Sequence, residues 1–276
     1  MATKMVCLAT VIVAIFLARC DAPKSKLLDA PIVAELKQGG DQGARTFDHS
    51  RFDALLREHV DEAWYVDYGG LAEDSEELDV YLKALETVAL QELSRDEQLA
   101  LLINAYNAFT LRLILDHRPD IESIKDIDDP WGKQRFTLGG HRVSLDEIEH
   151  GLIRPLFKDP RIHFAVNCAA VGCPPLARTA YTGQNIEAQL DQAARRALGS
   201  PRWARLENGT LQVTKVMDWY GEDFVSPEWK PRADSIAEWV ARHGPDEVRR
   251  AVDGGAVKVR FMDYDWRLND ARSQQQ

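Results

Sequence analysis

The stretch SRDEQLALLINAYNAFTLRLILDHRPD, residues 94–120, decides the fold because it predicts one long helix that is apolar on nearly every side. Ser94 and Glu97 have the spacing of a capping box, and Pro119 marks the other end. A helix that is apolar all round is buried. We therefore expect this helix at the centre of the domain.

Two asparagines interrupt this apolar helix. Asn104 and Asn107 are three residues apart and so lie on one face. A buried amide without a hydrogen bond costs about 1–3 kcal/mol, so both should meet polar partners from elsewhere in the fold. Either they bond to the backbone of a neighbouring loop, or they orient a catalytic group.

The segment RFTLGGHRVSLDEIEHGLIRP, residues 135–155, predicts a hairpin turning at Gly139–Gly140 and then a second helix. Ser144 and Glu147 form another capping box at its start.

On that second helix, Glu147, His150 and Arg154 share a face by their three-four spacing, and Glu149 points about a quarter turn away. A row of this kind is usually a solvated set of ion pairs. His150 is of interest because it is flanked by both a carboxylate and a guanidinium.

The stretch RIHFAVNCAAVGCPPL, residues 161–176, predicts a strand over RIHFAVN followed by a turn. Side chains alternate along a strand, so His163 and Asn167 would face one way and Cys168 the other. A straight strand would therefore keep His163 and Cys168 apart.

Cysteine usage leaves two thiols outside the N-terminal segment. Cys168 and Cys173 are five positions apart and would form a natural disulfide in an oxidising compartment, pinning a loop. Cysteine pairs for structural zinc usually come as C-x2-4-C with a second, similar pair elsewhere, and here one C-x4-C stands without a second pair. We predict no metal and no cofactor.

The N-terminus reads as an export signal. One early lysine precedes an apolar run over residues 5–18, which is too short to span a bilayer comfortably. We predict a signal peptide over residues 1–20 and a periplasmic or secreted protein. Two alternatives stay open: Cys20 as a lipidated N-terminus, although Arg19 is larger than that motif prefers, or an uncleaved anchor.

The net charge of −10 and the lack of a basic stripe argue against nucleic-acid binding. After the signal we expect a linker or poorly ordered lead-in over residues 21–45, one globular domain over 46–270 and a tail over 271–276. Further helices are predicted near residues 185–200 and 235–244, a hairpin at Asn208–Gly209 and a strand within 256–270. The fold class is α+β, with a mostly antiparallel sheet packed on the central buried helix.

Five blocks in order complete the pattern: LLINAYNAFTLRLIL, SLDEIEHGLIRP, IHFAVNCAAVGCPPL with Tyr181 after it, WYGEDF and YDWRLN. The chain from Phe52 to Asn269 thus resembles the domain-of-unknown-function-547 family. The resemblance implies a bacterial exported type. It directs attention to the following side chains as catalytic or binding candidates: Asn104, Tyr106, Asn107, Glu149, His150, Arg154, Cys168, and beside them His163, Cys173 and Tyr181.

Two functions follow as hypotheses. The first is a non-catalytic envelope domain that binds a peptide, glycan or protein, reaching the membrane only through a lipid anchor. It predicts a buried or disulfide-bonded Cys168 and a groove lined by aromatics such as Trp131, Trp219 and Tyr220.

The alternative is a cysteine-dependent amide hydrolase or acyl transferase acting on peptide-like substrates. Cys168 would be its nucleophile and His150 its base, with Glu149 or Asn107 holding the imidazole. A buried helix on an antiparallel sheet is also the plan of papain-like and transglutaminase-like enzymes. In those enzymes the nucleophile opens the central helix, where this chain has asparagines. The hydrolase predicts a partly exposed Cys168 with a nitrogen base in reach.

Overall fold

Helix α5, Arg95–His117, is the centre of the larger half of the protein, as expected from its apolar surface. The helix is long and apolar enough to cross a membrane, but it is buried among other elements as a core helix. Ser94 caps it by accepting a hydrogen bond from the backbone N–H of Glu97. The return half of the predicted capping box is absent, because the Glu97 carboxylate instead accepts hydrogen bonds from the backbone of Phe47 and Gly183.

The computed structural model describes residues 25–255 and 257–272. The predicted signal peptide, with Cys7 and Cys20, and the last four residues of the predicted tail lie outside the described residues. The first two tail residues are described, and Ala271 donates its N–H to the carbonyl of Val66.

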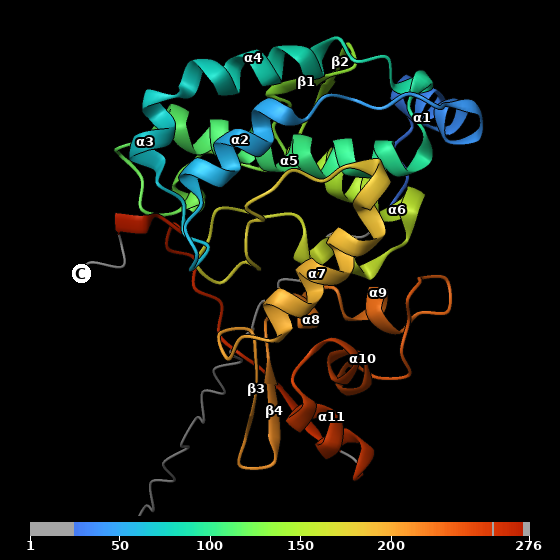
Figure 1. Ribbon diagram of the computed structural model, residues 1–276, viewed down its shortest axis with the longest axis vertical. Helices are drawn as coiled ribbons and strands as arrows, with labels where there is room; N and C mark the ends of the chain where they lie inside the picture. The colour runs from blue at the N-terminus through green and yellow to red at the C-terminus, as the bar shows by residue number, and fades with distance from the viewer. Residues whose placement is uncertain (1–24, 256, 273–276) are drawn as a thin grey trace, which may run out of the picture.

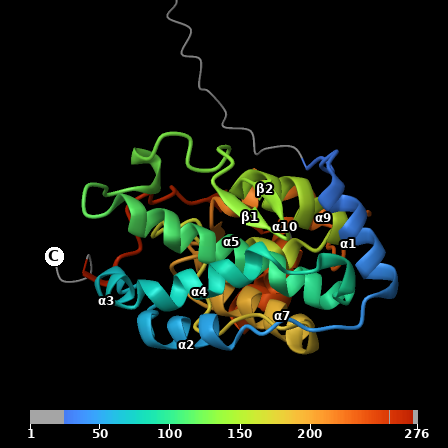
Figure 2. The same cartoon turned by 90° about the horizontal axis from the view of Figure 1, so that it is seen from above.

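Helices cover α5 on several sides (Figures 1 and 2). Helix α4 packs directly against it, and α2 packs on α4. These N-terminal elements are α1 (Pro31–Gln42), α2 (Ser50–His59), α3 (Tyr68–Glu73), α4 (Ser75–Glu86) and the short turn η1 (Leu90–Glu92).

Within the segment over residues 21–45 that was predicted as a linker or poorly ordered lead-in, the chain forms helix α1 over Pro31–Gln42. Its apolar side chains Ile32, Val33 and Leu36 are buried against the core around α5. The glycines in this segment suggested a break in the helix, but they permit close packing instead. A Cβ atom on Gly39 would lie 2.6 Å from the carbonyl oxygen of Leu90. Position 39 therefore needs glycine because the backbones of α1 and η1 nearly touch.

The middle of the chain begins with a turn, η2 (Ile124–Asp126), and the predicted hairpin of β1 (Phe136–Leu138) and β2 (His141–Val143). Both turn glycines, Gly139 and Gly140, have positive φ, as a two-residue hairpin turn requires. A π-helix, η3 (Glu147–Ile153), follows and continues as α6 (Arg154–Phe157).

The predicted strand over residues 161–167 is wrong. Residues Pro160–Phe164 form a turn of 3₁₀ helix, η4, and the chain then runs as a loop to the turn η5 (Gly183–Asn185). The carboxylate of Asp159 accepts the N–H of Arg161, and this cap starts a helical turn. The turn packs on α7, and its apolar residues are buried in the two cores, Ile162 in the one around α5 and Phe164 in the other, instead of by strand pairing.

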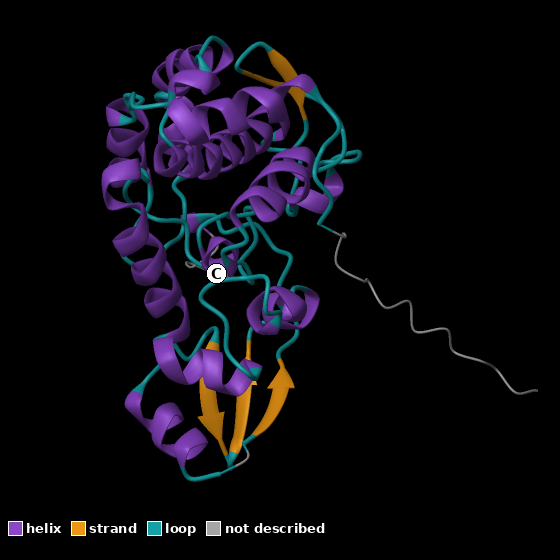
Figure 3. Ribbon diagram, turned by 90° about the vertical axis from the view of Figure 1, so that its right-hand side faces the viewer, coloured by secondary structure: helices purple, strands orange, loops and turns teal. Residues whose placement is uncertain are grey.

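The rest of the chain forms a second, smaller core (Figure 3). The described elements there are α7 (Ile186–Leu198), β3 (Ala204–Glu207), β4 (Thr210–Val213), α8 (Val216–Trp219), α9 (Gly221–Val225), α10 (Ile236–His243), α11 (Asp246–Asp253) and β5 (Lys258–Phe261). The α+β class is confirmed. The hairpin β3–β4 is antiparallel and turns at Asn208–Gly209 as predicted, but β5 joins β4 in parallel.

Helix α7 belongs to both cores. Ile186 and Leu190 near its start pack in the core around α5, whereas Ala194 and Leu198 near its end pack with the three-stranded sheet. The elements that pack most closely on α5 are α1, α4, α7, η3 and η5. The three-stranded sheet belongs to the other core, so the expected packing of a sheet on α5 is not found for that sheet.

The close approach at Gly39 gives a test of α1 packing. We expect Gly39→Ala to lower the free energy of unfolding by about 1–3 kcal/mol, because the new methyl group meets backbone oxygens that cannot move away. Gly40→Ala, one residue along the same helix, meets no atom closer than 3.7 Å and should be neutral or stabilising by up to about 1 kcal/mol. Urea unfolding measures both, and equal effects would contradict the packing.

Candidate functional site

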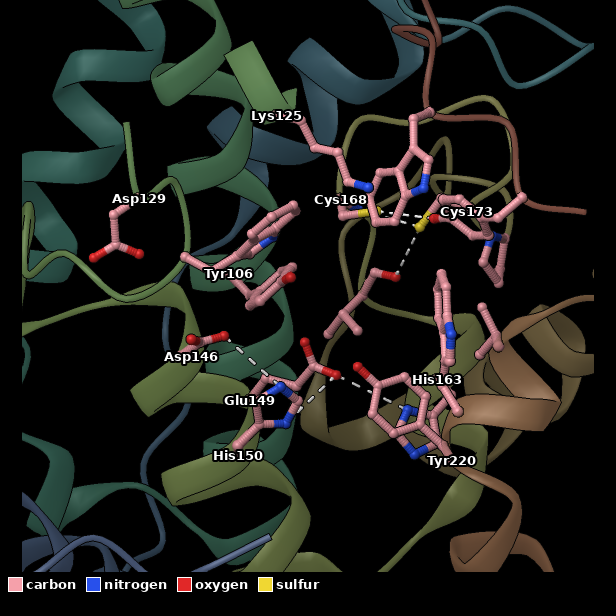
Figure 4. Close-up of a pocket in the computed structure, with 17 residues that line it drawn as sticks. Tyr106, Lys125, Asp129, Asp146, Glu149, His150, His163, Cys168, Cys173 and Tyr220 are labelled. Carbon is pink, nitrogen blue, oxygen red and sulfur yellow. Dashed lines mark hydrogen bonds and ion pairs between the residues drawn. The ribbon is translucent and has the colours of Figure 1, made fainter. Parts of the chain in front are cut away.

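A cavity of about 340 Å³ brings together most of the side chains that the sequence singled out (Figure 4). Its wall comes from α5, η2 and the loop after it, the π-helix η3, η4, the cysteine loop, α8 and the segment after β5. The predicted residues that line it are Tyr106, Glu149, His150, His163, Cys168 and Cys173. Asn104, Asn107, Arg154 and Tyr181 do not line it.

Aromatic rings form much of the cavity wall. Trp131, Trp219 and Tyr220, which the sequence suggested as groove residues, all line it, together with Tyr264 and Trp266. The Tyr264 ring lies 4.5 Å from the Trp266 ring and 4.8 Å from the Trp219 ring, measured between centroids. Aromatic rings at this separation attract each other. This part of the wall is therefore a packed aromatic surface, and the rings line the cavity.

The π-helix explains how the acid and the imidazole of the IEH block both reach the cavity. The N–H of Arg154 donates to the carbonyl of Glu149, five residues back, which widens the turn. Glu149 and His150 are consequently both buried at the cavity, whereas Glu147 stays at the capping box and bonds to Gln134. The expected row of Glu147, His150 and Arg154 forms only in part: Arg154 reaches His150, but Glu147 bonds elsewhere, because the prediction assumed a regular α-helix.

Glu149 lies between two imidazoles without a hydrogen bond to either. Its Oε1 is 3.8 Å from Nδ1 of His150 and 4.0 Å from Nδ1 of His163. Nδ1 of His150 is 3.3 Å from Nη1 of Arg154, and a guanidinium can only donate, so this nitrogen is an acceptor. No residue of the described chain donates a hydrogen bond to the Glu149 carboxylate.

His163 is held by an acidic residue from the other core. Its Nε2 is 2.7 Å from Oδ2 of Asp223, and its ring stacks on Tyr220 with centroids 4.1 Å apart. Arg154 donates two further hydrogen bonds to the same carboxylate, from Nε at 2.8 Å and Nη2 at 3.0 Å. The two sides of the cavity are thus joined by one buried charge network.

The pKa values in this network follow from burial and from these bonds. Burial lowers the pKa of His163, and the bond to Asp223 only partly opposes this. For Asp223, burial raises the pKa, but the bonds from His163 and Arg154 outweigh it and the net pKa is lowered. His163 is therefore neutral with its proton on Nε2, and its Nδ1 is an acceptor that has no hydrogen-bond partner in the described chain.

The two thiols lie at the other end of the cavity. Both are free; Cys168 is half-buried and Cys173 is buried. Sγ of Cys168 is 3.0 Å from the hydroxyl of Tyr264, while Sγ of Cys173 accepts the backbone N–H of Cys168 at 3.2 Å. No histidine among the described residues is hydrogen-bonded to either sulfur.

The side chains of the two buried asparagines form hydrogen bonds to the backbone of neighbouring loops. This is the first of the two interpretations that the sequence allowed. Asn104 donates to the carbonyl of Tyr181 and accepts from its N–H, at 2.8 and 3.0 Å. Asn107 donates to the carbonyl of Ala165 and accepts from the N–H of Asn167, at 2.9 and 2.8 Å. Tyr181 thus serves through its backbone, and Asn107 shapes the loop between His163 and Cys168.

Three residues of the cavity network were missed by sequence reasoning: Asp146, Asp223 and Tyr264. Asp223 and Tyr264 lie inside the WYGEDF and YDWRLN blocks, where an acid or a hydroxyl among aromatic residues is a usable signal of a buried polar group. Asp146 lies one residue before Glu147 and reaches the cavity rim, with Oδ1 3.8 Å from Nε2 of His150.

Comparison with known proteins supports the family resemblance over part of the chain. Residues 90–197 match the family described as protein of unknown function, DUF547. This range contains Glu149, His150, His163 and both thiols, whereas Asp223 and Tyr264 lie beyond it. No curated protein and no solved structure matches the chain.

The charge network predicts a large effect at Asp223. We expect Asp223→Asn to lower the free energy of unfolding by about 3 kcal/mol or more, because the buried Arg154 loses its compensating charge. The matched control is Asp218→Asn on α8, whose pair with Lys215 is at the surface and should count for less than about 1 kcal/mol. Chemical unfolding measures both, and a neutral Asp223→Asn would contradict the network.

His163 also predicts a pH dependence of stability. Its pKa is lowered in the folded protein, so the unfolded chain binds the proton first as the pH falls below 6.5. This lowers the free energy of unfolding until the pH reaches the pKa of the folded state. Unfolding curves from about pH 7.5 to 5 should therefore slope less for His163→Gln than for the wild type. Identical slopes would show that His163 does not titrate this way.

Proposed function

We propose that the protein binds a peptide-like ligand in this cavity through an ammonium group of the ligand. One observation carries the proposal: Nδ1 of His163 is fully buried without a hydrogen-bond partner in the described chain, and the cavity-lining carboxylate of Glu149 lies 4.0 Å from it and accepts no hydrogen bond from the described residues. Buried polar groups without partners are rare and costly. An ammonium group can donate to both at once and supplies the missing positive charge.

The charges around the cavity favour a cationic ligand. Three carboxylates line the cavity, those of Asp129, Asp146 and Glu149, together with the ammonium group of Lys125. Burial raises the pKa of Asp146; His150 lowers it in part, and the neighbouring Glu149 and Asp129 raise it further, so the net pKa is raised. Carboxylates that hinder one another's ionisation create a negative potential, which a bound cation relieves.

The aromatic wall suits the remainder of such a ligand. The rings of Trp219, Tyr264 and Trp266 provide apolar surface for a side chain and negative faces for a cation. Lys125 already occupies one face of Trp266, with its Nζ 3.7 Å from the ring centroid. The ligand ammonium is therefore expected at Glu149 and its side chain along the rings.

The alternative, a cysteine-dependent amide hydrolase, has less support. Cys168 is partly exposed, as that hypothesis requires, but its sulfur is bonded to Tyr264 and to no nitrogen base of the described chain. His150 faces Arg154 and Asp146 instead. A binding role uses the cavity as it stands, whereas hydrolysis needs a base to move.

We extend the proposal to export, so that the ligand would be a component of the cell envelope. The support is the apolar run over residues 5–18, followed by small residues at a suitable cleavage position. Cys20 as a lipid anchor remains part of the same proposal.

Titration with dipeptides tests the ligand class, because tryptophans line the cavity and their fluorescence reports occupancy. We expect a dipeptide with a free amino terminus to bind, and its N-acetylated form to bind about tenfold more weakly, or about 1.4 kcal/mol. Glu149→Gln should cause a loss of similar size by removing the carboxylate. Thiols are kept reduced throughout.

Asp128→Asn is the matched control. Asp128 is exposed next to the cavity residue Asp129 but does not line the cavity, so its neutralisation should leave the Kd within about twofold. Equal binding of the free and acetylated dipeptides, or binding only of a neutral disaccharide probe, would exclude ammonium recognition. A Glu149→Gln protein that binds normally would do the same.

A further inference from the structure

The two thiols are held together by a turn that the cavity-binding proposal does not use. Between them the chain reverses: Ala169 has φ +60°, and the N–H of Cys173 donates to the carbonyl of Ala170 at 3.0 Å. A left-handed alanine costs about 1–2 kcal/mol, so the surrounding contacts must hold it. The result places Sγ of Cys173 3.2 Å from the backbone nitrogen of Cys168.

Two side chains hold this turn closed, one from the loop itself and one from a distant segment. Asn167 accepts the N–H of Ala169 and donates to the carbonyl of Pro174, so one amide joins both ends of the loop. Trp203 donates from its ring to the carbonyl of Cys173 at 3.0 Å. The close approach of the Cys173 sulfur to the backbone of Cys168 is therefore built into the fold before any disulfide forms.

The two thiols differ in exposure and in acidity. A hydrogen bond from Cys173 lowers the pKa of Cys168, and the Tyr264 hydroxyl and the N–H of Ala170 lower it further against the effect of burial. Burial raises the pKa of Cys173, which is also held as the donor to Cys168. Both residues line the cavity, but Cys168 is half-buried whereas Cys173 is buried.

We propose that Cys168 and Cys173 form a thiol–disulfide exchange pair that reduces a disulfide-bearing substrate entering the cavity. The partly exposed Cys168 is the attacking thiol and the buried Cys173 the resolving thiol. The rings of Tyr264 and Trp219, packed beside Cys168, are the surface along which the substrate disulfide approaches. This activity is independent of ammonium recognition at Glu149.

The exchange proceeds in two balanced steps. The Cys168 thiolate attacks one sulfur of the substrate disulfide, a mixed disulfide forms, and the second substrate sulfur leaves as a thiolate that takes up a proton. Cys173 then loses its proton and attacks Sγ of Cys168, which forms the Cys168–Cys173 disulfide and releases the first substrate sulfur as a thiol. The substrate gains two electrons and the protein thiols lose two. A reducing dithiol returns the pair to its starting state.

Tyr264 has a positioning role in this scheme. Its hydroxyl lies 3.0 Å from Sγ of Cys168 and is itself kept protonated, because burial raises the pKa of Tyr264. It can therefore donate a hydrogen bond to the thiolate without competing for its proton. Removing the hydroxyl should slow attack by Cys168 while leaving Cys173 in place to resolve.

Trapping of the mixed disulfide tests the proposal on the full-length protein. The reduced protein is incubated with glutathione disulfide, and modified peptides are located by mass spectrometry, which separates these thiols from Cys7 and Cys20. In the wild type we expect a linked Cys168–Cys173 peptide. In Cys173→Ser we expect glutathione to remain on Cys168, at about tenfold or higher occupancy than on Cys173 in Cys168→Ser.

Tyr264→Phe provides a readout that does not depend on removing a cysteine. We expect its Cys168 to react several-fold more slowly with glutathione disulfide, with the circular dichroism spectrum unchanged. Equal modification of the two thiols, or no linked peptide at any ratio of glutathione disulfide to glutathione, would overturn the pair. The dipeptide titration is run on reduced protein, so failure of one proposal is distinguishable from failure of the other.

Discussion

The two amide side chains buried in α5 are the constraint on which the candidate site depends. A buried amide without hydrogen bonds is costly inside an apolar helix. Asn104 and Asn107 avoid this cost, because each donates to a carbonyl and accepts from an N–H of a loop backbone. Asn107 thereby holds residues 165 and 167, the stretch between His163 and the thiols. A desolvation requirement in the core thus determines where the reactive side chains of the cavity lie.

A second polar element links the two cores. Asp223 belongs to the core around the three-stranded sheet, yet its carboxylate is shared by Arg154 and His163 from the other side of the cavity. The charge of Asp223 sets the tautomer of His163 and leaves Nδ1 as a bare acceptor beside Glu149. The same bonds that join the cores therefore leave two acceptors at the cavity, Nδ1 of His163 and the Glu149 carboxylate. The absence of a donor to them from the described chain is the basis of the proposed ligand chemistry.

Much of the local structure was predictable, because it rests on local rules. The helix over 95–117 and the turns at Gly139–Gly140 and Asn208–Gly209 follow from apolar periodicity, capping and positive φ. The errors arose where packing overrides local preference. Helix α1 forms in a glycine-containing segment because its apolar face finds a partner, and residues 160–164 are helical because Asp159 caps the turn and α7 covers it.

For the site, the sequence by itself determined the inventory: two thiols, the Glu149–His150 pair, His163 and a supply of tryptophans, all in blocks specific enough to indicate a family. Only the tertiary structure decided which of them act together. The π-helix turned Glu149 inward, the loop held by Asn167 paired the thiols, and Asp223 reached His163 from sixty residues away. Such partnerships depend on hydrogen bonds between distant segments, and residue spacing carries no information about them.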